Sequence, residues 1–150
     1  MRIYLDNCCY NRPYDDQTQM RISLEAQAKL HIQDLIKEGQ YELVASYMLM
    51  YENSCNRVKV KRDTIKKFIE DNTVIYIDES KSLEAETIAE EIQKTGVKSA
   101  DSIHTACAIL ANCDYLLTTD DRLLKFRDDR ISVVDPTEFI RLTEGGKEYV

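Results

Sequence analysis

The chain has 150 residues, of which 43% are hydrophobic and 31% are charged, and its formal net charge is -7. A chain of this length forms one domain that buries about two-thirds of the surface of its unfolded state. We expect that domain to span residues 1–143, with a C-terminal tail at residues 144–150. No apolar stretch approaches the length of a signal-peptide core or a membrane span, so the sequence predicts a cytoplasmic protein with no membrane partner.

The five cysteines do not form a recognisable framework. They are odd in number, include an adjacent pair and lack any C-x-x-C spacing. This pattern argues against disulfides and against a zinc site, and we expect most of the cysteines to be reduced thiols in the core.

Net negative charge taken alone disfavours a nucleic-acid partner, because phosphate groups are normally met by a basic surface. Carboxylates that bind a divalent cation weaken this objection, because the bound cation presents positive charge to a phosphate. The charge is also uneven, since residues 57–67 contain six basic residues and one acid. This segment is the best candidate surface for an RNA backbone, and a solvated helix face is the alternative interpretation.

Five short apolar runs alternate with longer helical patterns along the chain. The runs predict strands at residues 2–5, 41–45, 73–77, 115–118 and 131–134. Helices are predicted at residues 18–38, 47–53, 64–70, 82–94, 99–110 and 136–143. Strands that alternate with helices in this way favour a single three-layer α/β/α domain with a central parallel sheet of about five strands.

Three of the predicted helices have an apolar stripe that we expect to face the core. In the helix at residues 18–38, that stripe is Met20, Leu24, Ala28 and Leu35, and His31 lies near it as a structural histidine rather than a ligand. The helix at residues 82–94 is built on Leu83, Ile88 and Ile92. The helix at residues 99–110 has Ser99 as its expected N-cap and Ile103, Cys107 and Leu110 toward the core. A different stripe of this last helix carries Asp101, Thr105 and Ala108, with His104 beside it.

Acids follow several of the predicted strands. Asp6 ends the first strand, and Thr119, Asp120 and Asp121 follow the fourth. Asp78 ends the third strand in the same way, although the initiation of a helix is a simpler explanation there. In an open parallel sheet the carboxyl ends of neighbouring strands meet at the edge where ligands bind. Each acid, taken alone, also fits a helix cap or a favourable charge at a helix N-terminus.

Two motifs in this part of the chain resemble those of PIN-domain nucleases. Residues 100–106 have the sequence ADSIHTA, similar to the ADxxHxA helix of that family, and residues 118–120 have the sequence TTD, similar to its TxD strand end. The strand that ends at Asp6 resembles the family's opening strand, and Glu52, in the helix after the second strand, takes the place of its second acid. Asn7 and Cys8 depart from the family pattern, in which a hydroxyl residue usually follows the first acid, so the supporting hydroxyl is missing or displaced. The opening is typical of a variant branch of the family.

The resemblance implies a metal-dependent ribonuclease that hydrolyses RNA phosphodiester bonds. Four acids are its expected catalytic residues and metal ligands: Asp6, Glu52, Asp101 and Asp120. Asp121 is expected as a further metal ligand or a substitute for Asp120. Such acids repel one another unless hard cations lie between them, and Mg²⁺ or Mn²⁺ prefers oxygen ligands. The expected supporting residues are Asn7, Thr119 and His104, with His104 a packing or hydrogen-bonding residue rather than a catalyst.

The expected partners are RNA, a small protein and a second copy of the chain. The candidate RNA contacts are Arg12, Arg57, Lys59, Lys61 and Arg62, and for Arg12 a salt bridge within its loop is the alternative to a phosphate contact. Members of the resembled family often act as toxins that a small antitoxin protein blocks, and homodimers are common among them.

Two other classes of function remain open at this point. A non-catalytic PIN-like module that binds RNA or protein is the main alternative, with activity lost through the altered turn at residues 6–8. A phosphotransfer or phosphatase domain is less well supported. A receiver domain needs paired acids after the first strand, a phosphatase needs DxD where this chain has DNC, and no Gly-rich phosphate loop is present.

Overall fold

A computed structural model describes residues 1–145 as an α/β domain. Its strands are β1 (Arg2–Leu5), β2 (Glu42–Ser46), β3 (Thr73–Ile77), β4 (Tyr115–Leu117) and β5 (Ser132–Val134). They form one sheet in the order β3-β2-β1-β4-β5, and every neighbouring pair is parallel. The predicted five-stranded parallel sheet is therefore confirmed.

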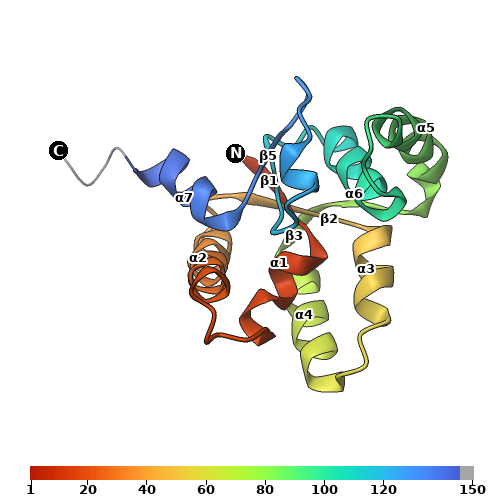
Figure 1. The fold of residues 1–150 in the computed structure, drawn as a ribbon. Coiled ribbons are helices and arrows are strands. Elements are labelled where there is room, and N and C mark those ends of the chain that lie inside the picture. The colour runs from red at the N-terminus through yellow and green to blue at the C-terminus, as the bar shows by residue number, and fades with distance from the viewer. Residues whose placement is uncertain (146–150) are drawn as a thin grey trace.

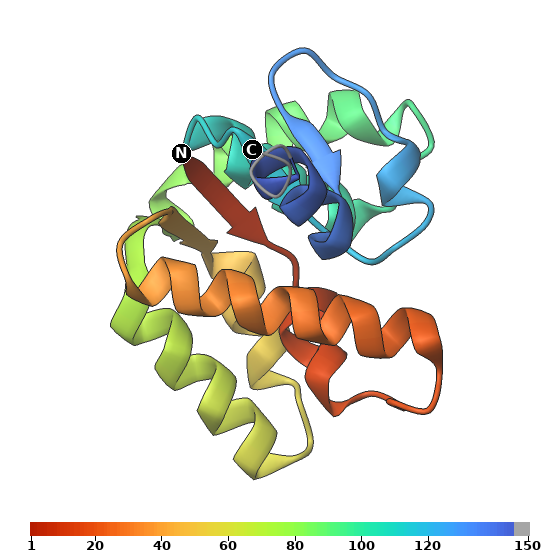
Figure 2. The same cartoon turned by 90° about the vertical axis from the view of Figure 1, so that its left-hand side faces the viewer.

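Helices cover both faces of this sheet. They are α1 (Asn7–Asn11), α2 (Met20–Lys37), α3 (Tyr47–Ser54), α4 (Lys59–Asn72), α5 (Ser82–Gln93), α6 (Ser99–Leu110) and α7 (Pro136–Glu144), with short 3-10 turns η1 (Arg12–Tyr14), η2 (Glu79–Lys81) and η3 (Leu123–Lys125). Figure 1 shows α5 and α6 on one side of the sheet and α1, α2 and α4 on the other. In Figure 2 the long helix α2 runs across the front of the molecule. None of the described helices combines the length and the apolar character that crossing a membrane requires.

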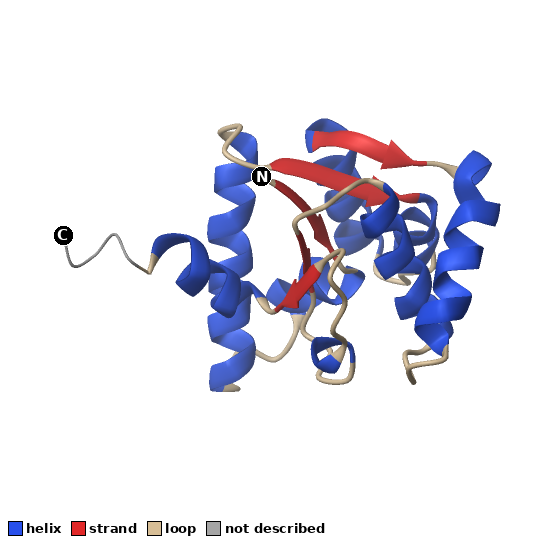
Figure 3. Ribbon diagram, turned by 90° about the horizontal axis from the view of Figure 1, so that it is seen from above, coloured by secondary structure: helices blue, strands red, loops and turns tan. Residues whose placement is uncertain are grey.

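The chain begins in the middle of the sheet, and this order of strands creates the place for a site. It moves outward from β1 to β2 and β3, and then returns to place β4 on the other side of β1. Figure 3 shows the twisted strands between their helices. The strand order therefore reverses between β1 and β4, and ligands bind such sheets beyond the carboxyl ends of the strands at this point.

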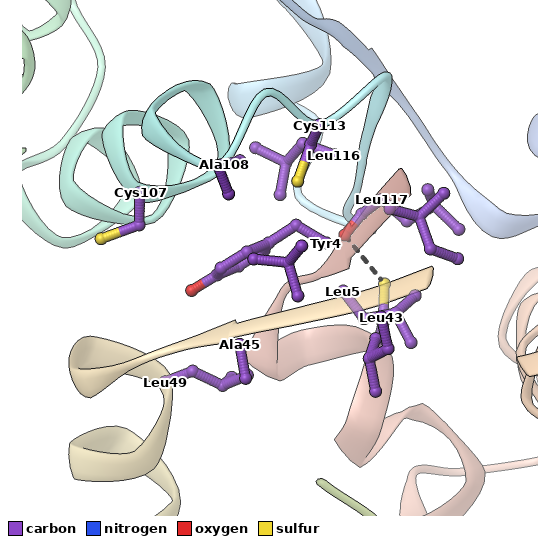
Figure 4. Close-up of a cluster of buried hydrophobic side chains, with 14 of the residues drawn as sticks. Tyr4, Leu5, Leu43, Ala45, Leu49, Cys107, Ala108, Cys113, Leu116 and Leu117 are labelled. Carbon is purple, nitrogen blue, oxygen red and sulfur yellow. Dashed lines mark hydrogen bonds between the residues drawn. The ribbon is translucent and has the colours of Figure 1, made fainter. Parts of the chain in front are cut away.

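The central strands are buried on both faces, which explains their continuous apolar sequence. Ile3, Tyr4 and Leu5 of β1 are fully buried. Figure 4 shows the Tyr4 ring between Cys107 and Ala108 of α6 on one side and Ala45 and Leu49 on the other. The five cysteines are free thiols, and three of them are buried, as predicted.

The predicted core face of α2 is only partly correct, because Ala28 is buried and Leu35 is half-buried whereas the other two predicted residues are exposed. Met20 is 75% exposed and Leu24 is 48% exposed, and His31 is exposed with its Nε2 2.9 Å from Glu144 Oε1 of α7. The buried face instead carries Glu25, Ala26, Ala28, Lys29, Ile32 and Ile36. Hydrophobic periodicity did not identify this face, because it assigns charged positions such as Glu25 and Lys29 to solvent.

One predicted helix start moves, because α4 begins at Lys59 rather than near residue 64 and its N-cap Val58 makes no side-chain capping bond. α6 keeps the predicted bounds, although its N-cap is Lys98 rather than Ser99. Leu83, expected in the core, is 78% exposed.

Asp78 accepts the Ser80 N–H at 2.9 Å, in agreement with its role in helix initiation. The predicted tail lies, from residue 146 onward, outside the described residues.

Lys29 is the most unusual buried charge of α2. It is 5% exposed, its Nζ donates to Gln33 Oε1, and the same atom lies 5.3 Å from the centre of the Tyr10 ring and 5.7 Å from that of Phe68. Burial lowers the pKa of Lys29 to about 8, because the charged form loses its hydration. The ammonium group therefore destabilises the folded state at neutral pH relative to an apolar side chain of the same length.

We predict that Lys29→Met raises the free energy of unfolding at pH 7 by about 1 kcal/mol. The pKa shift alone corresponds to up to about 3 kcal/mol, and the lost contacts with the two aromatic rings offset part of it. The pKa of Lys29 is lower in the folded state than in the unfolded state. The loss of stability caused by its buried charge is therefore fully present below pH 8 and decreases as the pH rises from about 8 to 10.5. Urea denaturation of both proteins across this pH range measures the effect.

Lys94→Met is the matched control, because Lys94 follows α5 with an exposed side chain that makes no hydrogen bond or ion pair within the described residues. This substitution is expected to change stability by less than about 0.5 kcal/mol at any of these pH values. A Lys29→Met protein less stable than the wild type at pH 7 contradicts the prediction.

Candidate active site

Asp6 occupies the point where the strand order reverses. Its backbone N–H donates to the Leu117 carbonyl at 2.9 Å, which extends the pairing of β1 with β4 by one residue. The side chain is nearly buried. Oδ1 accepts the N–H of Asn7 at 2.7 Å and Oδ2 accepts the hydroxyl of Thr118 at 2.9 Å. These bonds fix the carboxylate at the carboxyl edge of the sheet.

The altered turn after Asp6 keeps a hydroxyl at the site. The thiol of Cys8 lies 3.4 Å from Asp6 Oδ2 and 3.4 Å from Thr118 Oγ1, and it accepts the N–H of Thr119 at 3.3 Å. The Thr118 hydroxyl also accepts the N–H of Asp120 at 3.2 Å. The supporting hydroxyl is therefore displaced to the end of β4 rather than missing. Thr118 was not among the predicted supporting residues, although it directly precedes Thr119.

His104 lies between the first and second acids. Its Nε2 is 2.5 Å from Glu52 Oε1 and 3.8 Å from Asp6 Oδ1. The ring is fully buried, whereas the Glu52 side chain is 28% exposed. Burial by itself lowers the pKa of His104, but the hydrogen bond to Glu52 and the charges of Asp6, Glu52 and Asp101 outweigh it and raise that pKa. The surrounding acids therefore favour the protonated form of the imidazole.

Two residues that the sequence did not single out fix the ring of His104. The Tyr4 hydroxyl lies 2.6 Å from His104 Nδ1 and 2.6 Å from Ser46 Oγ. Ser46 in turn accepts the Leu49 N–H at 3.2 Å as the N-cap of α3, the helix that carries Glu52. A tyrosine in an apolar strand and a serine at a helix start are ordinary structural residues, so no sequence signal marked this network.

Asp101 lies in the first turn of α6 and completes the group of acids. Its pKa is raised to about 6, first by burial and then by the negative charges of Asp6, Asp120 and Glu52, with His104 acting in the opposite direction. The charges of Asp6, Glu52 and Asp120 therefore act on Asp101. Among the described residues, the group whose ligand atoms lie within 4.8 Å of one another is Asp6, Glu52 and His104.

Asp120 and Asp121 are adjacent in sequence but point to different partners. Asp120 Oδ1 accepts the N–H groups of Arg122 at 2.8 Å and Leu123 at 3.3 Å, and its charge acts on Asp101. Asp121 is 72% exposed and forms a two-pronged ion pair with Arg21 of α2, at 2.8 and 3.1 Å. The hydrogen bond from Arg21 holds the pKa of Asp121 below its ordinary value. The structure does not bring Asp121 to the other acids.

Arg12 is engaged by acids of its own neighbourhood. It lies 3.2 Å from Asp15 Oδ2 and 3.3 Å from Glu25 Oε1, and only 17% of its side chain is exposed. These contacts favour the salt-bridge alternative over a phosphate contact.

The other candidate RNA contacts surround the start of α4. Lys61 lies over the Tyr14 ring, 5.5 Å from its centre, and Arg62 donates to a backbone carbonyl at 3.2 Å. Arg57 and Lys59 are exposed and make no side-chain hydrogen bond or ion pair within residues 1–145. Figure 1 shows this end of α4 far from α6, so the structure does not bring these cations to the acids.

The donor set fits a divalent cation. Asp6, Glu52 and His104 offer ligand atoms that all lie within 4.8 Å of one another. Mg²⁺ and Mn²⁺ prefer carboxylate oxygens such as those of Asp6 and Glu52. Burial and then the charges of Asp6 and Asp120 raise the pKa of Asp101, and a cation bound at this group would favour its charged form.

Comparison with known proteins assigns the fold independently. The family model described as PIN domain matches residues 3–129. No curated protein sequence matches the chain.

Solved structures with this fold cover nearly the whole chain. The structure of FitAB bound to the IR36 DNA fragment is 19% identical and has a TM-score of 0.57, covering 90% of this chain and 95% of its own. VapBC-1 from nontypeable Haemophilus influenzae is 18% identical with a TM-score of 0.54, covering 91% and 99%. VapBC2 from Rickettsia felis, bound to a DNA fragment from its promoter, is 16% identical with a TM-score of 0.53, covering 89% and 97%.

We predict that Asp101→Asn stabilises the metal-free protein by about 1 kcal/mol at pH 7, after allowance for solvent screening at this partly exposed carboxylate. The folded-state pKa lies above that of the unfolded chain, so the charged form is disfavoured in the fold. The loss of stability caused by charged Asp101 is fully present above pH 6 and disappears as the pH falls from about 6 to 3.8. Chemical denaturation in EDTA between pH 4 and 7 measures the difference between the two proteins.

Asp129→Asn is the control, because Asp129 is exposed and makes no side-chain contact of its own within the described residues. We expect no stabilisation from it. A difference between Asp101→Asn and the wild type that stays constant with pH contradicts the electrostatic explanation.

Proposed function

Because this chain belongs to the PIN-domain family, we propose that it is a metal-dependent endoribonuclease that hydrolyses RNA phosphodiester bonds with Mg²⁺ or Mn²⁺. One observation carries the proposal: Asp6 and Glu52 contact a buried histidine at the edge of the sheet where β1 and β4 meet, and the charges of Asp6, Glu52 and Asp120 act on Asp101. A structural role for each acid separately does not account for their mutual repulsion.

When bound, the cation would lower the pKa of a water molecule and would place positive charge next to the phosphodiester. Asp6 provides a rigid ligand, because three neighbouring groups hold its two oxygens. Glu52 is more exposed, and its hydrogen bond to His104 orients it toward Asp6. His104 acts as a positioning residue that holds a proton between the two carboxylates. Asp101 holds its own proton below about pH 6, so metal binding there competes with protonation.

We further propose that the protein is the toxin of a toxin–antitoxin pair, in the cytoplasm, with a small antitoxin protein as its partner. Members of the PIN family often have this role, and the likeness to FitAB and VapBC-1 supports it. A homodimer is part of the same proposal.

The nuclease proposal predicts opposite behaviour for two adjacent acids. Asp120→Asn is expected to lower the rate of RNA cleavage by at least about 100-fold, because it removes a ligand carboxylate. Asp121→Asn is the matched control and is expected to stay within about threefold of the wild type, since it breaks only an exposed ion pair with Arg21. Cleavage of a labelled single-stranded RNA in Mn²⁺, in Mg²⁺ and in EDTA measures both.

Each other outcome identifies a different error. Equal loss in the two variants shows that Asp121 is a ligand after all. Equal activity in all three proteins, or activity that persists in EDTA, indicates a contaminating nuclease. A silent wild type for which calorimetry finds no Mn²⁺ site dependent on Asp6 identifies a non-catalytic PIN-like module instead.

The partner proposal predicts that a small protein encoded next to this chain co-purifies with it after joint expression and suppresses cleavage. Asp101→Asn should still retain that partner, because a blocking protein covers the site without using its chemistry. Recovery of only free protein under native expression counts against the toxin role and leaves the nuclease proposal unaffected.

A further inference from the structure

A basic hollow lies beside the acids. It has a volume of about 380 Å³ and is lined by residues from two segments: Thr95, Gly96 and Val97, between α5 and α6, and Arg122, Lys125, Phe126 and Arg127, in and around η3. The backbone of Gly96 has a φ of +102°, which allows the chain to turn sharply out of α5 and form one wall.

Three cations line this hollow, and no acid of the described chain does. Arg122 and Lys125 are exposed and make no side-chain hydrogen bond or ion pair within the part of the chain that the structure describes. Arg127 donates to the backbone carbonyls of Leu124 at 2.6 Å and Phe126 at 3.1 Å, which fixes its guanidinium. Although the chain has a net charge of -7, the three cations of this lining form a local positive field that attracts anions.

Both walls of the hollow are attached to the acid cluster. Asp120 accepts the N–H of Arg122, which lies two residues after it. The opposite wall ends at Val97, whose carbonyl accepts the hydroxyl of Ser102 at 3.4 Å, next to Asp101 in α6. Each wall of the hollow is therefore linked through the chain to a residue of the proposed site.

We propose that this hollow is a binding site for the RNA backbone, in which Arg122 and Lys125 hold a phosphate adjacent to the one that is cleaved. The inference rests on the proposed nuclease function and names the part of the surface that the substrate follows. A volume near 380 Å³ lies at the small end of ligand pockets, so it suits one nucleotide of a single strand rather than a duplex. An arginine fork and a flexible ammonium are the usual donors to phosphate oxygens.

Binding of fluorescein-labelled oligouridine in EDTA, where no cleavage occurs, tests the site. The double variant Arg122→Gln/Lys125→Gln is expected to bind at least about 10-fold more weakly. The slope of log affinity against log salt should become shallower by about 0.7, because the variant loses one single-strand phosphate contact and each contributes about 0.7. The control Lys37→Gln/Arg141→Gln makes the same change of charge on α2 and α7, and we expect its affinity to stay within about twofold of the wild type.

Cleavage kinetics in Mn²⁺ separate this inference from the proposed function. The double variant should raise KM while kcat stays within about threefold, because the contact is made equally in the ground state and the transition state. Cleavage by the wild type with unchanged affinity and KM in the double variant overturns the inference alone. Binding that depends on Arg122 and Lys125, without metal-dependent cleavage, supports the inference and overturns the proposed function.

Three further outcomes overturn the inference. One is a wild type that binds no oligouridine, and another is an equal loss of affinity in the Lys37→Gln/Arg141→Gln control. Displacement of the RNA by polyglutamate at the same concentration of charge also overturns it, because the hollow then accepts acidic protein as readily as RNA.

Discussion

The hydrogen bonds of His104 hold the rest of the site in place. One nitrogen contacts the Tyr4 hydroxyl of β1, and the other contacts Glu52 of α3, so the ring joins three elements distant in sequence. Hydrogen bonds to charged groups each stabilise a fold by about 1.5 to 3 kcal/mol, and a buried polar group that loses its partner costs about as much. Removing any one partner therefore disturbs the position of the acids even where it leaves the sheet intact.

The same arrangement stores electrostatic repulsion. Four carboxylates and one imidazole share the edge of the sheet, and the raised pKa of Asp101 shows that the acids are not fully balanced. A protein selected only for stability has no reason to keep such a cluster, since replacing one acid by a neutral residue relieves the repulsion. Sites that sacrifice folding stability in this way are typically those that bind a ligand of the opposite charge.

The sheet was predictable because its strands are short apolar runs between helical patterns, a signal that survives without tertiary information. The motif at residues 100–106 and the strand end at residues 118–120 similarly located two acids. The sequence failed where a distant residue decides the outcome. Arg21 draws Asp121 away from the site although the two are 100 positions apart, and Glu25 and Lys29 conceal the core face of α2. Tyr4 and Thr118 carry no motif, because their role exists only once β1 and β4 are paired.

The distribution of cations answers the objection that an acidic protein makes a poor partner for RNA. Several basic side chains near the site are already occupied, since Arg21 pairs with Asp121 and Arg12 pairs with Glu25. Arg122 and Lys125 of the hollow make no ion pair within the described residues. In physiological salt the Debye length is about 8 Å, and charges farther apart than this are largely screened, so a strand lying against the hollow responds to the local charge rather than to the net charge of the chain. The acidic surface therefore repels most polyanions, and an RNA strand binds where it lies against the cations of the hollow.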